Sequence, residues 1–427
     1  MDRNGTAPAD EKSGQLNPPL QGTTDVGNSL LTIDMITRKA LEIFENNLVL
    51  TRNINRQYDD SFAKEGAKIG STLRIRLPDR ALVTDGAALQ VQDENEQFTT
   101  LSVSNQKHIG VNFTTAEMAL SLDDFADRIL KPRISQLAAS VDADVANVYR
   151  SVYNAVGTAA VTPATSEVLL AGQRILNEGA VPMGPRYATV NPAANAGLVE
   201  GLKGFFNPGD VISRQFKSGM MGTDVLGYDE INMSQSIKVH TYGTRAATGA
   251  TVTTTVATQG ATTIAITGTG SQVINAGDTF TIDNVFAVNP QTRESTGQLQ
   301  RFVCTATNTA SGGAYTSVAI SPPIFTSSEA LATVNSFPQA NAAIIFNGVA
   351  STSAPQNLIY HKDAFAFATA DLLLPQGVDM ASRQVHNGIS MRIVRDYDIN
   401  NDRMPCRIDV LYGYGAIRPS AATRLLG

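Results

Sequence analysis

The chain has 427 residues, of which 42% are apolar and 17% charged, and this predicts a globular protein with more than one hydrophobic core. Its net charge of −6 and pI near 5.3 exclude a dedicated nucleic-acid binder, because such a protein needs a basic field. The sequence has no apolar run long enough to span a bilayer and no signal-peptide pattern, so we expect a protein made in the cytosol without a membrane segment.

The first elements along the chain are a polar N-terminus and a helix. Residues 1–28 are rich in Gly, Pro, Asn, Asp and Thr and lack apolar periodicity, so they bury too little surface to offset the entropy of ordering. We expect residues 1–30 to be flexible. Residues 31–50 carry apolar side chains at helical spacing among charged ones, which predicts an amphipathic arm.

A long hairpin is predicted within residues 71–113. Apolar and polar residues alternate over 73–77 and again over 101–113, which is the period of a strand. The residues between, 84–97, are polar. A two-stranded ribbon is only marginally stable alone. Because neither the ribbon nor the arm has an obvious partner in the chain, we expect both to pack between subunits.

A long helix is predicted over residues 122–156. Ser121 and Asp124 have the spacing of a capping box, and Pro132 either kinks the helix or separates a short helix from a longer one. At about 1.5 Å per residue, the whole stretch would span roughly 50 Å. Apolar residues at steps of three and four predict one buried stripe. This stripe consists of Ile134, Leu137, Ala138, Val141, Val145, Val148, Tyr149 and Val152.

Short apolar runs predict a mixed α/β region in the rest of the chain, apart from residues 241–345. Helices are expected at 162–179, where Gly179 would end the helix, and at 362–370. The expected strands are 187–190, 225–228, 357–360, 389–394 and 406–412.

Residues 241–345 differ sharply in composition from the flanking sequence. They contain 22 threonines and only seven charged residues in 105. Their short Val- and Thr-rich runs are separated by Gly and Asn, which favours strands. We predict a small all-β domain, a barrel or a sandwich, inserted into the mixed α/β region.

No catalytic, cofactor or metal site is predicted. Asp396, Asp398 and Asn400 have calcium-loop spacing, but Asn401 replaces the required Gly and Arg407 the bidentate Glu, so we interpret this stretch as a polar turn. There is no GK[ST] phosphate loop and no GxSxG elbow, although a triad assembled from distant residues stays open. The four histidines, none in a metal-ligand motif, are His108, His240, His361 and His386.

Two further groups of reactive residues are interpreted as structural. Cys304 and Cys406 form no CxxC pair, and we expect each to be a small buried hydrophobe, not a reactive thiol. Adjacent His361, Lys362 and Asp363 could suggest acid and base catalysis, but a polar helix start is the favoured interpretation.

The order of the predicted elements resembles the major capsid proteins of tailed bacteriophages. These proteins share the Hong Kong 97-type fold, and the chain is most similar to the P22-like coat proteins, which carry an inserted β-barrel. The segments that carry the resemblance are SLDDFADRILKPRISQLAASVDADV (121–145), GDTFTIDNVFAVNPQTRESTGQLQRFVC (277–304), NLIYHKDAFAFATADLLLP (357–375) and RIDVLYGYGAIRP (407–419).

The resemblance implies an α+β chain of several domains. The implied divisions are a flexible N-terminus (1–30), an N-terminal arm (31–70), an E-loop hairpin (71–113), a peripheral domain (114–180) with a spine helix (122–156), an axial domain in two parts (181–240 and 346–400), an inserted β-barrel (241–345) and a C-terminal strand of the peripheral domain (401–427).

The resemblance also implies a structural protein of the virion capsid, without enzymatic activity or cofactor. Hexamers and pentamers would form an icosahedral head in the host cytoplasm, together with a scaffolding protein and a portal protein. The head would expand as it encloses double-stranded DNA, which the shell does not bind sequence-specifically. Asp34 lies where a basic scaffold end docks in the family, so it is a candidate scaffold contact; a plain solvated charge is the alternative.

One departure from the fold bears on its chemistry. Some members join an E-loop lysine covalently to an asparagine of a neighbour. Here residues 71–106 contain no lysine, and Lys107 lies on the returning strand, away from the tip. We therefore expect a shell held together without covalent cross-links.

Two other functions are alternatives to a phage capsid. A bacterial nanocompartment shell shares the fold and packages an enzyme, but the added β domain argues against it. A Thr-rich adhesin or carbohydrate-binding module would have no place for the long helix, and the chain lacks the tryptophan that stacks on sugars.

Overall fold

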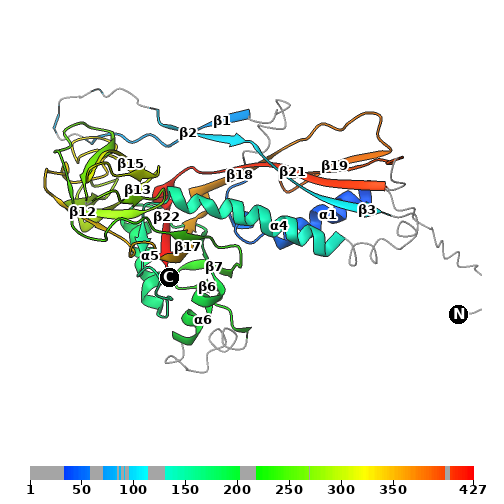
Figure 1. Cartoon of the computed structure of the whole chain (residues 1–427), viewed down its shortest axis with the longest axis horizontal. Helices are drawn as coiled ribbons and strands as arrows, with labels where there is room; N and C mark the ends of the chain where they lie inside the picture. Colours follow the sequence, from blue (N-terminus) through cyan, green and yellow to red (C-terminus); the bar gives the residue numbers. More distant parts are fainter. Residues whose placement is uncertain are drawn as a thin grey trace, which may run out of the picture.

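The computed structural model describes residues 33–57, 71–83, 86–87, 91, 96–113, 130–201, 218–268, 270–399 and 404–427. Its parts are an elongated layer of helices and strands, a mixed sheet with two helices, and a closed barrel at the end opposite the arm (Figure 1). None of the helices in these ranges is long and apolar enough to cross a membrane.

The arm is helix α1 (Ile33–Asn47), which ends slightly before the predicted residue 50. Its apolar face packs against helix α4 (Lys131–Val145) and strands β19 (Met380–His386) and β20 (Ile389–Arg395) of the same chain. The expectation that this face packs between subunits is therefore wrong. The partner strands begin more than 330 residues after the end of α1, so local sequence patterns gave no sign of them.

All eight residues of the predicted stripe are buried, and the first five of them, from Ile134 to Val145, lie in helix α4. Pro132 lies in the first turn, where its missing N–H removes no helical hydrogen bond. The helix tightens into a 3₁₀ segment, η4 (Ala146–Ser151), and the chain is extended from Val152. The predicted end at 156 is wrong because β4 (Ala155–Val156) joins a sheet. The capping box at Ser121 lies outside the described residues.

The hairpin consists of β1 (Ser71–Arg76) and β2 (Phe98–Val103), paired antiparallel with Arg76 opposite Phe98. Its apolar face lies on the chain's own β18 (Phe365–Ala370) and β21 (Met404–Ala416), so the hairpin has a support within the chain that the sequence did not predict. The return strand is also shorter than predicted. Residues 105–113 form a separate strand, β3 (Asn105–Phe113), which pairs with β21 over nine residues.

The elongated sheet has the order β18-β21-β20-β19, with β3 on β21. Strand β18 occupies most of the range 362–370 where a helix was predicted, and only Lys362–Ala364 forms a short 3₁₀ turn. All six residues of β18 are buried. A strand buried on both faces shows no alternation, so its Ala-rich run could not be distinguished from a buried helix.

The mixed sheet has the order β4-β22-β17-β5-β7-β6. Helix α5 (Ser166–Glu178) packs on it and ends at Gly179, as predicted, although it begins four residues later than 162. The predicted strand 225–228 is instead the two-residue turn between β6 and β7, where Leu226 and Gly227 have positive φ. The remaining elements are β5 (Arg186–Val190), α6 (Pro192–Gly201), β6 (Gly222–Val225), β7 (Tyr228–Met233), β17 (Ser353–His361) and β22 (Ala422–Leu426).

The Thr-rich segment forms a closed six-stranded barrel, which confirms the predicted all-β insertion. Phe280, Phe302 and Phe346 pack together in its core. Beside the barrel, β11 (Val273–Ile274) pairs with β14 (Asn308–Thr309). The barrel strands are β9 (Ala250–Val252), β10 (Ala261–Thr267), β12 (Thr279–Val288), β13 (Ser295–Cys304), β15 (Ala314–Ile324) and β16 (Ala343–Phe346).

The barrel is inserted between two strands that pair with each other. Strand β8 (Val239–Thr241) leads into it, and β17 receives the chain afterwards. Their antiparallel register places Thr241 opposite Ser353. The two connections to the barrel therefore lie side by side, and the barrel is a domain inserted into the mixed sheet.

Candidate assembly site at the base of the inserted barrel

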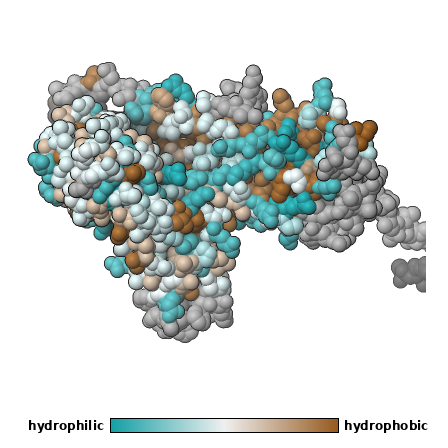
Figure 2. Space-filling view, in the orientation of Figure 1, coloured by the Kyte–Doolittle hydropathy of each residue, from teal (hydrophilic) through white to brown (hydrophobic). Residues whose placement is uncertain are grey.

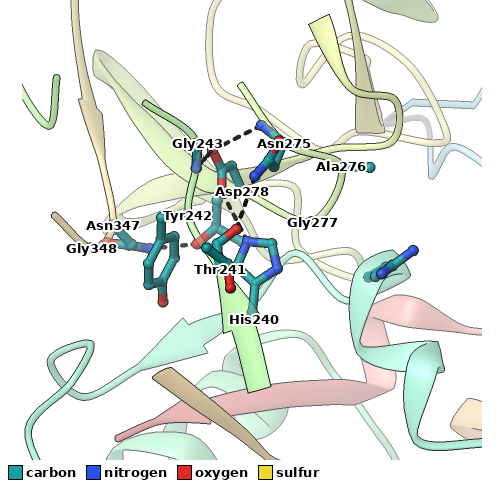
Figure 3. Close-up of polar contacts among 12 residues, drawn as sticks. His240, Thr241, Tyr242, Gly243, Asn275, Ala276, Gly277, Asp278, Asn347 and Gly348 are labelled. Atoms are coloured by element: carbon teal, nitrogen blue, oxygen red, sulfur yellow. Dashed lines mark hydrogen bonds and ion pairs between the residues drawn. The ribbon is translucent and has the colours of Figure 1, made fainter. Parts of the chain in front are cut away.

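A buried polar cluster lies where β8 and β17 meet the barrel (Figure 3). At its centre is Asp278, whose side chain is fully buried. Asp278 Oδ1 lies 2.9 Å from His240 Nε2, and Oδ2 accepts hydrogen bonds from the N–H groups of Gly243 and Asn275, each at 3.2 Å. One barrel carboxylate thus holds the strand that enters the barrel.

His240 connects the barrel to η4, the 3₁₀ segment that follows α4. A carboxylate can only accept, so the contact with Asp278 places a proton on His240 Nε2. In the neutral ring, Nδ1 then accepts from the Tyr149 hydroxyl, 3.1 Å away on η4. Tyr242 packs edge-on against the imidazole with ring centroids 4.9 Å apart. The ring is therefore fixed between the barrel, β8 and the end of the spine.

Arg245 holds the strand that leaves the barrel. Its Nη1 and Nη2 donate to the carbonyl oxygens of Gly348 and Asn347 at 3.0 and 2.7 Å, and its guanidinium lies over the Phe346 ring. Arg245 Nε lies 3.3 Å from Asp278 Oδ2 without hydrogen-bond geometry, so this contact is an ion pair only. The buried ion pair of Arg245 with Asp278 therefore links the connection that enters the barrel to the connection that leaves it.

Arg424 of β22 brings the C-terminal strand into the same cluster. Its Nε donates to Val152 O and its Nη1 to Gly277 O, both at 2.7 Å. Burial lowers the pKa of Arg424 to about 10, while nearby Tyr149 and Asp278 oppose the shift, so the group is a cation at neutral pH. The carboxylate of Asp278 thus compensates part of the buried positive charge of both Arg245 and Arg424. Such a cluster is costly to disturb, because each group left alone would be an uncompensated buried charge.

The backbone of the junction requires glycine at two positions. Gly348 has φ +80°, and a Cβ there would lie 2.5 Å from Tyr242 Cε2. Gly277 has φ +102°, and its Cβ would lie 3.0 Å from His240 Cε1. Both aromatic rings of the cluster therefore lie directly against glycine backbone.

Comparison with known protein families identifies the chain. The model of the family described as "P22 coat protein - gene protein 5" matches residues 26–427, which is nearly the whole sequence. The chain belongs to the P22 coat protein family. The resemblance inferred from the sequence is thus confirmed, and the chain is a phage capsid protein, a structural component of the virion that acts as many copies in a shell.

Solved structures that align with the chain include several from phages and a virus-like particle from Pyrococcus furiosus. The chain aligns with a structure from Mycobacterium phage Che8 at 11% identity and a TM-score of 0.43, covering 88% of this chain and 90% of that one. It aligns with the capsid of Cyanophage P-SCSP1u at 11% identity and a TM-score of 0.39, covering 84% of each chain. No curated protein sequence matches the chain.

Asp34, the candidate scaffold contact, lies in the first turn of α1 and is exposed. Its Oδ1 accepts a hydrogen bond from Ser382 Oγ at 2.5 Å and one from Gln384 Nε2 at 3.5 Å, both on β19. Asp34 therefore helps to bind the arm to β19 through its Oδ1 atom, and the residue is still exposed to solvent.

Lys107 was expected on the returning strand of the hairpin, away from its tip, and the structure places it on β3, which pairs with β21 and is not part of the hairpin. Its Nζ lies 2.7 Å from Asp144 Oδ2 on α4 and donates to Ser140. The amine is thus engaged in an ion pair on the spine and is not presented as a nucleophile.

The cysteines and histidines lie in structural positions. Cys304 and Cys406 are both buried, as predicted, and burial raises the pKa of Cys406 to about 12. His361 ends β17, and its Nδ1 accepts from the N–H of Asp363. His386 lies 3.6 Å from Glu45. Within the described ranges, no group of three or more His, Cys, Asp or Glu residues could hold a metal ion, and the calcium-like turn extends beyond these ranges at 400–403.

Sequence reasoning missed the Asp278 cluster. His240 had been counted only as one of four scattered histidines. A usable signal was present, since Arg245 and Asp278 are two of only seven charges in residues 241–345. A buried charge needs an opposite charge, and a nearly uncharged β domain offers few. Arg245 and Asp278 could therefore have been predicted to pair with each other, and Arg245 lies close to the start of the domain.

Proposed function

We propose that the chain is the major capsid protein of a tailed double-stranded DNA phage, assembling into hexamers and pentamers of an icosahedral head. The observation that carries this proposal is the family match over residues 26–427. The inserted barrel, which leaves and re-enters through the paired strands β8 and β17, supports it. The implied axial and peripheral divisions of the chain form part of the proposal.

We further propose that contacts between subunits are noncovalent. One apolar face of the arm and one of the hairpin pack within the chain, so we propose that exposed apolar residues elsewhere contribute to the lattice contacts. In Figure 2, hydrophobic residues gather on the elongated layer formed by α1, α4 and the sheet around β21. Exposed large apolar side chains on this sheet and its connections are Leu373, Leu374, Val385, Tyr397 and Ile399. Burying them between copies supplies the hydrophobic stabilisation that a cross-link would otherwise provide.

The shell would assemble in the host cytoplasm around a scaffolding protein, with a portal protein, and expand as DNA is packaged. The acidic residues of α1 support a basic scaffold segment as the partner. Asp34 is exposed at the start of the helix, and Glu42 lies further along it, only weakly engaged by Lys39 at 3.2 Å. The acidic chain would enclose DNA without holding it tightly.

Co-expression with the scaffolding protein of the same phage, followed by negative-stain imaging, tests this function. The expected result is uniform closed shells of tens of nanometres. Asp34→Asn should reduce the yield of closed shells, while Asp283→Asn, an exposed barrel carboxylate, should leave it unchanged. A chain that remains monomeric with every scaffold and at every concentration would contradict the proposal.

A further inference from the structure

Two adjoining cavities lie where the residues after β1, the barrel, α5 and the C-terminal segment meet. Their volumes are about 240 and 190 Å³. Arg80, Gly179, Pro290 and Ser420 line both cavities, so the two are lobes of one space. Chain segments far apart in sequence thus enclose a single site.

Three arginines face this space from different parts of the fold. Arg80, which follows the hairpin strand β1, lines both lobes; Arg301 of β13 lines one, and Arg418 before the last strand lines the other. Each is half-buried. Within the described part of the chain, none of the three guanidinium groups has an ion-pair or hydrogen-bond partner. This is unusual, because guanidinium groups away from bulk water are normally paired.

The rest of the lining does not balance these charges. Glu178 is the only carboxylate among the described residues of either lobe; it pairs with Arg174 at 3.5 Å, and its charge also favours the Arg301 cation, so one carboxylate is shared by two arginines. Burial lowers the pKa of His361 in the second lobe, with a smaller contribution from Arg418, so its imidazole is neutral at pH 7. Burial also lowers the pKa of Arg80, and the neighbouring charge of Arg418 adds to the shift. The cavity therefore carries a positive charge excess.

We propose that this cavity binds a small oxyanion of the phosphate class, held by Arg80 and Arg301 in the larger lobe, while Arg418 adds positive charge from the adjoining lobe. The planar guanidinium fork matches the geometry of phosphate oxygens and can donate two hydrogen bonds to one anion. Either lobe is large enough for an inorganic phosphate ion. Because Arg80 and Arg301 come from separate segments, the bound anion fastens the hairpin connection to the barrel. Arg293 Nη2, which donates to Val83 O at 3.3 Å, joins the same two parts nearby.

Isothermal titration of the purified full-length chain with inorganic phosphate, at ionic strength held constant with chloride, tests the site. One saturable binding event is expected for the unaltered chain. Arg301→Gln should weaken phosphate binding at least tenfold. Arg76→Gln removes the same charge from an exposed hairpin position that does not line the cavity, so it should leave affinity within twofold.

Arg80→Gln provides a second variant in case Arg301→Gln disturbs the barrel, because Arg80 lies in a connection and not in a barrel strand. It too should weaken phosphate binding at least tenfold. Absence of saturable binding to the unaltered chain would overturn the proposal. So would an Arg76→Gln variant that loses as much affinity as the cavity variants. Shell formation is a separate measurement, so neither result depends on the proposed function.

Discussion

Asp142 of the spine accepts hydrogen bonds from both the hydroxyl and the N–H of Thr51, at 2.6 and 2.9 Å. Its second carboxylate oxygen accepts from the N–H groups of Val49 and Leu50 at 3.1 and 3.0 Å. All three backbone donors lie just after α1, where the chain turns away from the helix. This buried carboxylate therefore fixes the arm to the spine within one subunit.

Replacing Asp142 with Ala should strongly destabilise the subunit. The change leaves two buried N–H groups, the half-buried N–H of Val49 and a buried hydroxyl without an acceptor, so the expected loss is about 3 kcal/mol or more. Chemical denaturation of the full-length chain measures it. Asp283→Ala removes an exposed carboxylate from the barrel and should change stability by less than about 0.5 kcal/mol. Equal effects of the two changes would contradict the role given to Asp142.

Asp278→Asn should loosen the barrel from the mixed sheet. The variant keeps the size of the side chain but removes the only charge opposite Arg245 in the buried cluster, a loss of about 3 kcal/mol. Limited proteolysis should then cut near residues 241–245 and 347–352 while the barrel itself persists as a fragment. If Asp278→Asn resists proteolysis as well as Asp283→Asn does, the cluster does not hold the junction.

Gly348→Ala should cost more than Gly297→Ala. Both glycines have positive φ, so each alanine bears a backbone cost of about 1 kcal/mol. Only the Cβ at 348 would also meet Tyr242, whereas the one at 297 has open space within 4 Å. Melting temperatures of the two variants compare them directly. A Gly348→Ala variant that melts with or above Gly297→Ala would show that the Tyr242 ring moves aside freely.

The thiol of Cys406 should stay protonated in the native chain well above the pH at which an ordinary thiol ionises. Burial raises its pKa to about 12 from the usual value near 9, so ionisation is favoured only in the unfolded chain. Its contribution to stability is thus complete below pH 9 and is lost as the pH rises towards 12. Thiolate absorbance of native Cys304→Ala protein at pH 10 should be near zero, and it should appear on unfolding. Full thiolate absorbance in the native state would contradict this.

The sequence was informative where one face of an element is buried and the other is solvated. The stripe from Ile134 to Val152 was predictable for this reason, and so was the Thr-rich barrel, whose low charge sets it apart. The helical segment ends before the predicted residue 156 because β4 pairs in parallel with β22, near the C-terminus. Local periodicity carries no information about a partner so distant.

The same limit explains the other errors. Strand β18 is buried on both faces and therefore lacks alternation, while β3 and the hairpin share a strand period but belong to different sheets. The expectation that arm and hairpin need another subunit failed because β19, β20 and β21, their true supports, follow hundreds of residues later. Membership of the coat protein family, and not that argument, carries the functional assignment.

Cryo-electron microscopy of particles co-expressed with the scaffolding protein tests the central claim most directly. The account predicts a closed icosahedral lattice of hexamers and pentamers in which each subunit carries its barrel on β8 and β17 and each arm lies on its own β19. The particles should dissociate to a single 45.3 kDa band under denaturing conditions. Particles without such a lattice, or covalently linked rings on the gel, would contradict it.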